Sequence, residues 1–298
     1  MSRLPYYAKF WLRYFTKSFD GQTPDEKFLE DQKSNINYYC KIDQQISLQK
    51  GIKLHDINLL KNSGYTYDLY NILYPFREKL RFNFIPGDVT TVPDQPAFVK
   101  SRPIEGDNDN SVLLPLDSQR HFRFVNDRIS YADKLDGVVW RGAAYQEHRI
   151  RFLKSCSELK FVNAGNTAVQ KNGCVPFARP KMSINEQLEY KFVLSLEGND
   201  VATNLKWIMS SNSVCLMPRP KYETWYKEGT LIPNYHYVEI RDDFSDIKSK
   251  FKYCLKNPEF CNLIIGNANN YTKSYLNNKK TLDLSRSVVM KYYERTLW

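Results

Sequence analysis

The pattern of apolar and polar residues changes at about residue 135. Beyond it, short apolar runs alternate with segments in which apolar residues recur every three or four positions. The clearest unit is a nearly continuous apolar run at 191–196, followed by a polar turn and a helical pattern. That pattern puts four side chains on one helix face: Val201, Leu205, Ile208 and Met209. Strands alternating with helices predict a parallel, Rossmann-like sheet, in which ligands bind at the carboxyl ends of strands.

Further elements follow from the same patterns. In the second half we expect buried strands at 137–140, 159–163, 213–217 and 235–240, and helices at 148–154 and after Asp243, which would cap its helix. In the first half we expect mostly helix over 23–80, a strand at 79–85 closed by the turn Pro86-Gly87-Asp88, and a turn-rich loop at 101–111.

The length of the chain, 298 residues, predicts two domains. We place an N-terminal domain at 1–125 and the Rossmann-like domain at 126–275. A C-terminal helix is expected at 276–298, where it could pack back on the first domain.

The first 20 residues combine aromatic and basic side chains. Seven aromatic residues between positions 6 and 19 are interleaved with Lys9, Arg13 and Lys17. This composition suits a helix in a membrane interface, where rings lie at headgroup depth and cations meet anionic lipid. It equally suits a helix that docks on the protein's own core. The sequence leaves both interpretations open.

Composition narrows the class of protein. With 42% hydrophobic and 26% charged residues, the chain is typical of a globular protein rather than a disordered one. Forty-three Lys and Arg against 33 Asp and Glu give a formal charge of +10, which favours anionic partners: nucleic acid, nucleotide phosphates or an acidic membrane surface. We find neither a secretory signal pattern nor an apolar run of spanning length, and we therefore expect a cytoplasmic protein.

Metal and hydrolase chemistry have little support. The six cysteines form no C-x-x-C pair and lack histidines at metal spacing, so we expect reduced core thiols: Cys40, Cys156, Cys174, Cys215, Cys254 and Cys261. The four histidines form no i, i+4 pair and no nucleophile elbow. Asp107-Asn108-Asp109 has the form of a metal-binding Asp-x-Asp, but in a polar loop it reads as a solvated turn. The basic cluster at 120–123 could meet an anionic substrate or form a surface strand.

Two turns carry candidate chemistry. Glu197-Gly198-Asn199-Asp200 lies between a predicted strand and helix, where free amides and the helix dipole would suit a diphosphate. Arg141-Gly142 follows another strand and Lys206 lies one turn into the helix, so we expect a phosphate pocket. The sequence of this turn lacks the G-x-G-x-x-G pattern of dinucleotide-binding sites. Asp88 would present a carboxylate at a strand end, although Pro-Gly-Asp is usually only a turn.

The block at 190–240 resembles glycosyltransferase family 90. That family includes protein O-glucosyltransferases, capsule-associated xylosyltransferases and bacterial lipopolysaccharide core glycosyltransferases. The matching stretches are Tyr190–Asn199, Leu205-Lys206, Ser210–Leu216, Tyr222–Trp225 and Asn234–Tyr237, with Trp140-Arg141-Gly142, Arg149 and the segment Phe84–Asp88 with Val92-Pro93 upstream. The resemblance spans roughly residues 80–275, and within the family the sequence is most similar to the bacterial lipopolysaccharide subgroup.

This resemblance implies an α/β, GT-B-like fold with two Rossmann-like domains that face a cleft. The first would lie on the acceptor side and the second would bind the nucleotide sugar. It further implies a metal-independent, inverting hexosyltransferase without a cofactor, which moves a hexose from a UDP-sugar to a lipopolysaccharide inner-core sugar. Such an enzyme would be peripheral at the inner face of the inner membrane, where it could contact anionic lipid.

The resemblance also suggests roles for individual residues. Asp88 would be the general base, since a positioned base is worth about 10²–10⁴ in rate. The nucleotide sugar would be contacted by Arg141, Gly142, Arg149, Glu197, Gly198, Asn199, Asn204, Lys206 and Glu223. Among these, Arg141, Lys206 and the amides near Gly198 would stabilise the leaving diphosphate. Glu223 would accept hydrogen bonds from the ribose hydroxyls.

Some positions depart from the family pattern, and other functions stay open. Ala143, Ala144 and Tyr145 stand where many members carry Ser, Arg and Thr, and Asn204 stands where many carry Arg, so one basic contact to the diphosphate would be missing. The alternatives are a capsule polysaccharide or protein O-glycosyltransferase, a non-enzymatic protein on a transferase scaffold, and a nucleic-acid-binding protein. Because no RRM, KH or helix-turn-helix signature is present, nucleic acid is not expected as the partner.

Overall fold

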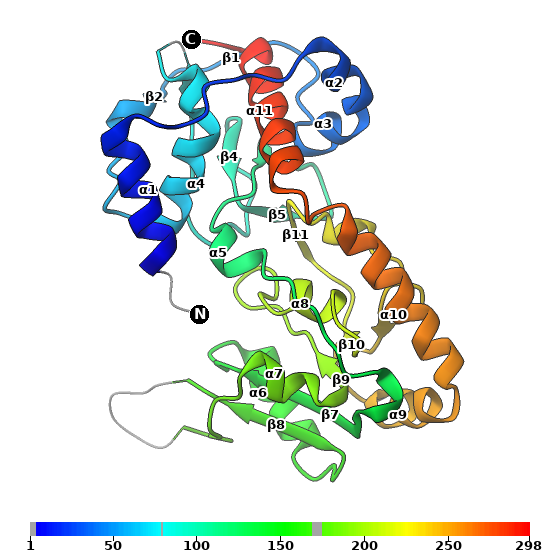
Figure 1. Cartoon of the computed structure of the whole chain (residues 1–298). Helices are drawn as coiled ribbons and strands as arrows, with labels where there is room; N and C mark the ends of the chain where they lie inside the picture. The colour runs from blue at the N-terminus through cyan, green and yellow to red at the C-terminus, as the bar shows by residue number, and fades with distance from the viewer. Residues whose placement is uncertain (1–3, 79, 169–174) are drawn as a thin grey trace. The chain divides into compact units, whose positions relative to one another are not determined.

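The computed structural model describes residues 4–78, 80–168 and 175–298, which form two compact units (Figure 1). Unit 1 consists of Met1–Phe122, Lys221–Glu228 and Asn277–Trp298, and unit 2 of Arg123–Pro220 and Gly229–Leu276. The chain therefore passes between the units several times, and unit 1 is assembled from three separate segments.

Unit 2 is built on a five-stranded parallel sheet with the strand order β12-β10-β9-β7-β8. Its strands are β7 (Leu135–Gly142), β8 (Val162–Asn166), β9 (Tyr190–Leu194), β10 (Val214–Met217) and β12 (Val238–Glu239). Numbered within the unit, the order is 2-1-3-4-5, that of flavodoxin-like doubly wound proteins. The parallel, Rossmann-like sheet predicted from the sequence is confirmed.

The helices of unit 2 cover this sheet. They are α6 (Glu147–Cys156), α7 (Ile184–Leu188), α8 (Leu205–Met209), α9 (Ile247–Lys256) and α10 (Pro258–Lys273), with a 3-10 turn at Tyr131–Asp133. One apolar cluster joins α6, α9 and α10 to the strands through residues such as Phe152, Phe192 and Phe251. Strands β9 and β10 are buried on both faces, which explains why they read as continuous apolar runs.

Three predicted boundaries in unit 2 are wrong. Strand β8 begins three residues later than expected, and helix α8 has only five residues, so Val201 precedes it. Helix α9 begins at Ile247 with Asp246 at its N-cap position. Asp243 is not the cap because its Oδ1 accepts hydrogen bonds from the main-chain N and the Oγ of Ser245, 3.0 and 2.8 Å away.

Unit 1 combines helices with very short strands. Its helices are α1 (Leu4–Thr16), α2 (Glu26–Asp31), α3 (Lys33–Tyr39), α4 (Ser63–Leu73), α5 (Ser118–His121) and α11 (Asn278–Arg295), with 3-10 turns at Leu54–Asp56 and Tyr74–Phe76, and at Glu228–Thr230 where the chain leaves the unit. Four strand pairs accompany them: β1 (Ile46–Ser47) with β13 (Thr296–Leu297), β2 (Ile52–Lys53) with β3 (Arg81–Phe82), β4 (Ala97–Val99) with β6 (Ser111–Leu113), and β5 (Ser101–Pro103) with β11 (Tyr222–Thr224).

The described part of unit 1 thus contains two-stranded sheets only, and the second Rossmann-like sheet that a GT-B fold requires is not seen there. Its strands are two or three residues long, too short for a wide sheet. The strand predicted at 79–85 begins outside the described residues and is reduced to β3 plus a parallel bridge between Phe84 and Phe98. The loop predicted at 101–111 is shorter than expected, because its first three residues form β5 and its last residue begins β6.

The C-terminal helix α11 belongs to the core of unit 1. Tyr292 is fully buried, packs on Phe98 with 4.4 Å between ring centroids, and donates a hydrogen bond to the carbonyl oxygen of Pro96 over 3.1 Å. The guanidinium of Arg286 is also buried and lies 3.0 Å from a carboxylate oxygen of Asp20. These contacts tie the last segment of the chain to the first.

Helix α1 docks on α4 through aromatic side chains. Phe10 stacks on Tyr67 with the ring centroids 3.8 Å apart, and the Tyr6 hydroxyl donates to Asp68 over 2.6 Å. One face of this helix therefore docks on the protein's own core. The five cysteines within the described residues are buried free thiols, as predicted, whereas Cys174 lies outside those residues.

Candidate functional site

The strand order of unit 2 reverses between β7 and β9. From β7 the chain proceeds to β8 on one side, returns to β9 on the other, and continues to β10. Because the two strands are parallel neighbours, their carboxyl ends meet at the same edge. This is the position at which doubly wound proteins bind their ligands. The loops that follow it carry two predicted site segments, Gly142 with its neighbours and Glu197-Gly198-Asn199.

Arg149 of α6 ties these two loops together. Its Nη1 donates to the carbonyl oxygen of Ala143 after β7, over 2.8 Å. Its Nε and Nη2 donate to the carbonyl oxygens of Glu197 and Leu196 after β9, over 2.8 and 2.9 Å. The guanidinium also lies 5.7 Å from the ring centroid of Trp140. One side chain thus holds the loop after β7 and the loop after β9 at a fixed spacing.

Two further side chains before or on α6 hold the second loop. His148 Nε2 lies 2.8 Å from the carbonyl oxygen of Glu197, which can only accept, so this nitrogen carries the proton. Gln146 donates from Nε2 to Oδ1 of Asn199 over 2.8 Å. Neither residue was selected from the sequence. Both could have been suspected from the sequence, because Gln146 lies just before, and His148 within, the helix that follows the strand ending in Arg141-Gly142.

The diphosphate site predicted at the start of a helix does not form as expected. The Gly198 amide donates to the carbonyl oxygen of Asp200 over 3.0 Å and closes a turn. Helix α8 begins only at Leu205, with Asn204 at its N-cap position. Asn204 instead links the end of β9 to α8, since its Nδ2 donates to the carbonyl oxygen of Leu194 over 2.9 Å.

The Arg141 guanidinium does not bind the loop at Gly198 but donates hydrogen bonds to other parts of unit 2. Its Nε donates to the carbonyl oxygen of Pro180 over 3.0 Å, and its Nη1 and Nη2 donate to the main-chain and side-chain oxygens of Asn163, both over 2.8 Å. Burial lowers the pKa of this guanidinium, and the neighbouring Arg179 lowers it further. Lys206, also predicted at the diphosphate, has a completely buried side chain on α8.

Gly142 allows Trp140 to lie against the end of β7. A Cβ atom at this position would come within 2.6 Å of the indole Cζ2, closer than carbon atoms approach. The predicted Trp-Arg-Gly motif is therefore a packing unit as well as a strand end. It shapes the start of the loop that follows β7.

Glu223 lies in unit 1 on β11, opposite Arg102 on β5. Its Oε1 accepts from the Nε of Arg102 over 2.8 Å, and its Oε2 accepts from the Tyr38 hydroxyl. Both residues of the ion pair are buried. Glu223 belongs to unit 1, whereas the other predicted nucleotide-sugar residues belong to unit 2, and both of its carboxylate oxygens accept hydrogen bonds from side chains of unit 1.

Asp88 also lies in unit 1, at the carboxyl ends of parallel segments. Phe84 bridges β4 in parallel, and β4 pairs with β6 in parallel. Gly87, with φ of +106°, turns the chain directly before Asp88. The residues that follow the three segments therefore meet at one edge.

The side chains at this edge surround the Asp88 carboxylate. Lys100 Nζ, itself buried, lies 2.6 Å from Oδ1, and Arg120 Nη1 lies 3.6 Å from it. The Tyr65 hydroxyl is 3.4 Å from the same oxygen, and Lys100 Nζ is also 3.4 Å from His121 Nε2. The Asp88 side chain keeps 17% of its surface exposed, so it is held by cations yet reachable.

Sequence reasoning missed Lys100, although a lysine that ends an apolar strand was a usable signal. The cluster at 120–123 was expected to meet an anion or to form a surface strand. The strand is wrong, because Arg120 and His121 lie on the short helix α5.

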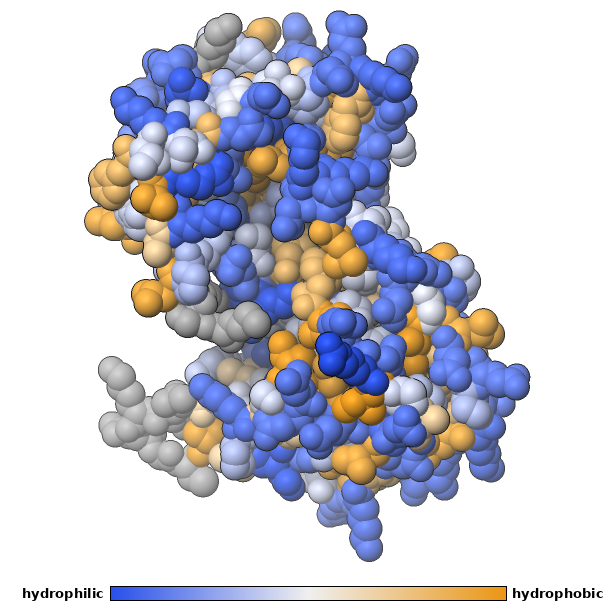
Figure 2. All heavy atoms as spheres, viewed as in Figure 1, coloured by the Kyte–Doolittle hydropathy of each residue, from blue (hydrophilic) through white to orange (hydrophobic). Residues whose placement is uncertain are grey.

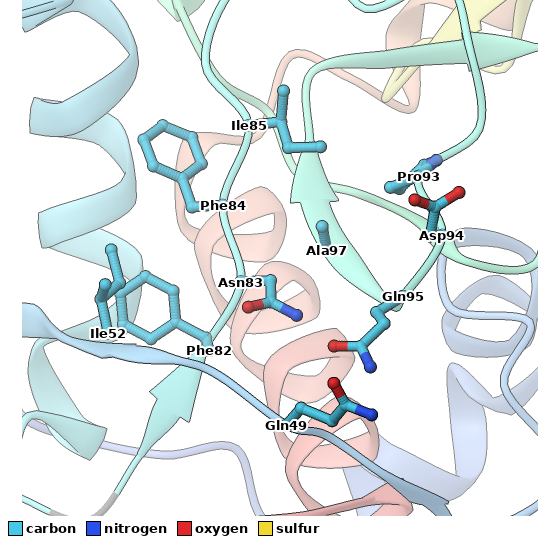
Figure 3. A pocket seen from close by; sticks show the side chains of 10 residues that line it. All are labelled: Gln49, Ile52, Phe82, Asn83, Phe84, Ile85, Pro93, Asp94, Gln95 and Ala97. Atoms are coloured by element: carbon cyan, nitrogen blue, oxygen red, sulfur yellow. The ribbon is translucent and has the colours of Figure 1, made fainter.

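A pocket of about 540 Å³ opens near this region of unit 1 (Figure 3). The carboxamides of Gln49, Asn83 and Gln95 gather on one side of it. The complete lining consists of Gln49, Ile52, Phe82, Asn83, Phe84, Ile85, Pro93, Asp94, Gln95 and Ala97. Asp88 is not among the lining residues, so the pocket and the carboxylate are separate features.

Neither a metal cluster nor a spanning helix is found in the part of the chain that the structure describes. No group of three or more His, Cys, Asp or Glu side chains there could hold a metal ion. Asp107 and Asp109 form a local turn, in which the Asp109 amide donates to Asp107 Oδ1 over 3.1 Å. No described helix is both long and apolar enough to cross a bilayer.

Comparison with known proteins decides the family. The model of glycosyl transferase family 90 matches residues 117–296, more than half of the chain. The chain belongs to glycosyltransferase family 90. The family resemblance predicted from the residues at 190–240 is confirmed, and the protein is a glycosyltransferase.

Two curated relatives of the family 90 chain are informative. It is 43% identical over 261 residues to an O-glucosyltransferase LpsA from Dichelobacter nodosus, a match that covers 87% of this chain and 82% of the relative. It is 26% identical over 172 residues to protein O-glucosyltransferase 3 from Rattus norvegicus, covering 56% of this chain and 33% of the relative.

Proposed function

We propose that this family 90 protein is an inverting hexosyltransferase that transfers a sugar from a UDP-sugar to a lipopolysaccharide inner-core sugar. The observation that carries the proposal is the switch point between β7 and β9 in unit 2, whose two loops are joined by hydrogen bonds from Arg149. The similarity to a protein named O-glucosyltransferase LpsA supports glucose as the hexose and lipopolysaccharide as the acceptor.

The donor is proposed to lie across the carboxyl ends of β7 and β9. Gly142, Gly198 and Asn199 would lie nearest to it, and Arg149 would act as a positioning residue that presents both loops. Arg141 and Lys206 point elsewhere or are buried, so we propose that their part is to stabilise unit 2 and its electrostatic potential. In this proposal unit 2 binds the donor and unit 1 supplies the base.

The reaction would be one displacement without a metal. The acceptor hydroxyl oxygen forms a bond to C1 of the sugar, and the bond from C1 to the diphosphate oxygen breaks. Asp88 takes the hydroxyl proton. Lys100 and Arg120 lie within 4 Å of this carboxylate and would hold it in position. We expect proton transfer to accompany bond formation, when the attacking hydroxyl has become acidic.

The test combines donor binding with product analysis. Calorimetry should show binding of UDP that GDP does not match, and incubation with UDP-glucose and a deacylated lipopolysaccharide core should give a β-linked product by NMR. Capsule oligosaccharide and peptide acceptors, tested in parallel, distinguish the alternative acceptors. Absence of UDP binding, together with tight and strongly salt-dependent binding of a single-stranded oligonucleotide, would contradict the proposal.

A further inference from the structure

Helix α1 has a second apolar face in addition to the one that docks on α4. Four residues recur at i, i+4, i+8 and i+11 and so share one side of the helix: Leu4, Ala8, Leu12 and Phe15. The three large ones are 73%, 64% and 75% exposed. Figure 2 shows hydrophobic residues gathered at the left of the view, where α1 lies in Figure 1. We call these four residues the α1 stripe.

Positive charge accompanies the stripe. Lys9 and Lys17 are exposed, and neither forms an ion pair with any residue that the structure describes. Arg13 lies over the ring of Phe19, 4.6 Å from its centroid. Positions 4–19 of the sequence contain no Asp or Glu. The exposed surface of α1 is therefore apolar and cationic.

We propose that the α1 stripe is a docking surface for an anionic lipid bilayer. Such a surface buries apolar side chains at the boundary of headgroups and acyl chains while cations meet lipid phosphates. Leu12 and Phe15 would enter the interface, and Lys9 and Lys17 would lie at headgroup level.

The docked face of α1 prepares the stripe for this contact. Phe10 stacks on Tyr67, and Tyr6 is hydrogen-bonded to Asp68, so the helix is already formed and oriented. A preformed helix does not have to fold when it binds, which removes an entropic cost of association. Interfacial peptides that fold on the membrane lack this advantage.

A second copy of the chain is a poorer occupant. An aromatic side chain buries about 150–250 Å², and even three side chains of that size, more than Leu4, Leu12 and Phe15 offer, fall short of the roughly 800 Å² per partner of a stable interface. The proposal does not depend on the donor site, although a lipid-linked acceptor would be presented at such a bilayer.

The experiment is vesicle cosedimentation of the full chain, with phosphatidylcholine vesicles and with vesicles containing one quarter phosphatidylglycerol. We expect binding to the anionic vesicles only, weakened by salt. The double variant Leu12→Ser/Phe15→Ser should lower the partition coefficient at least about tenfold, and Lys9→Gln/Lys17→Gln should lower it several-fold. The matched control is Leu263→Ser, since Leu263 is 67% exposed on α10 of unit 2 and should not affect binding.

The outcomes decide between the occupants. Circular dichroism and UDP affinity of the stripe variant should match those of the native protein, because the replaced side chains are exposed. Equal vesicle binding by the native protein and the stripe variant, or no binding by either, would overturn the proposal. So would a lipid-free dimer, seen by light scattering, that Leu12→Ser/Phe15→Ser converts to monomer. Loss of transfer activity without loss of vesicle binding would count against the proposed function and leave this proposal standing.

Discussion

The Arg149 guanidinium donates a hydrogen bond from Nε to the main-chain oxygen of Glu197, 2.8 Å away. With its bond to Ala143, this contact makes the spacing of the two loops at the switch point depend on one side chain of α6. A flat guanidinium can serve both loops at once, which a lysine ammonium on a flexible stem cannot do with the same geometry.

Replacing Arg149 by Met should weaken UDP binding at least about tenfold. The two loops would lose the charged hydrogen bonds that hold them in position, which are worth about 1.5–3 kcal/mol each. Arg149→Lys should recover only part of the affinity. Calorimetry measures both. The control is Arg151→Met, since Arg151 is exposed on the same helix. Equal losses in both variants would show that general charge, not loop positioning, sets the affinity.

Asp88→Asn should reduce kcat by about 10² or more, because the amide has the shape of the carboxylate but cannot take the proton. UDP affinity should stay within twofold of the native value. Turnover with a lipopolysaccharide core acceptor and calorimetry of the same preparation are the measurements. Asp43→Asn, at an exposed position of unit 1, is the control. A variant with nearly native turnover would return Asp88 to the role of a turn residue.

Glu223→Gln should destabilise unit 1 by about 3–5 kcal/mol, since it leaves the buried Arg102 without its counter-charge. Chemical denaturation measures the change, with the exposed Glu105→Gln as the control. UDP affinity of the folded variant should be native. A stable Glu223→Gln protein with weakened UDP binding would instead support the ribose contact predicted from the sequence.

Asp68 should make stability fall as pH rises from about 4 to 6. Burial raises the pKa of its carboxyl to about 6, although hydrogen bonds from Ser118 and Tyr6 oppose the shift. Between about pH 4 and 6 the folded state therefore keeps a proton on Asp68 that the unfolded state has released. This contribution to the free energy of unfolding is fully present below pH 4 and is lost above pH 6. The loss should be up to about 3 kcal/mol.

The measurement for Asp68 is the unfolding free energy of native protein and Asp68→Asn at several pH values. The unfolding free energy of the native protein minus that of Asp68→Asn should fall between pH 4 and 6 and be flat above pH 6.5. Asp31→Asn, an exposed control on α2, should parallel the native curve throughout. A difference that rises with pH would mean that the Asp68 pKa is lowered.

Transfer should survive excess EDTA, since the proposed reaction uses no metal. Asp107→Asn/Asp109→Asn should leave activity unchanged because these residues form a local turn. Loss of turnover in EDTA that Mg²⁺ or Mn²⁺ restores would contradict this prediction and direct attention to those two carboxylates.

The sheet of unit 2 was predictable because its strands are buried on both faces and read as apolar runs. The direction of single side chains was not. Arg141 was expected to follow a buried strand, but it lies within β7, and its guanidinium donates to two oxygens of Asn163 on the neighbouring strand β8. Lys100 could not be joined to Asp88 from the sequence, since their proximity depends on a bridge between Phe84 and Phe98.

Helix α8 shows a second limit of prediction. The i, i+4 pattern at Val201 and Leu205 is real, but both residues are buried without belonging to one helix. Periodicity reports which side chains are buried, and a turn can bury them as well as a helix can. The two-residue strands of unit 1 leave even less signal, because alternation cannot be recognised over two positions.

The parallel pairing of β1 with β13 joins residues near position 46 to residues near position 296. During synthesis the ribosome releases the chain from its N-terminus, so the first 122 residues emerge long before their partners in α11 and β13. Unit 2, which ends at Leu276, can fold first, although it begins later in the gene. Buried surfaces of Phe98 and Asp20 must meanwhile wait for Tyr292 and Arg286, and in that interval the nascent unit 1 is a natural client for chaperones.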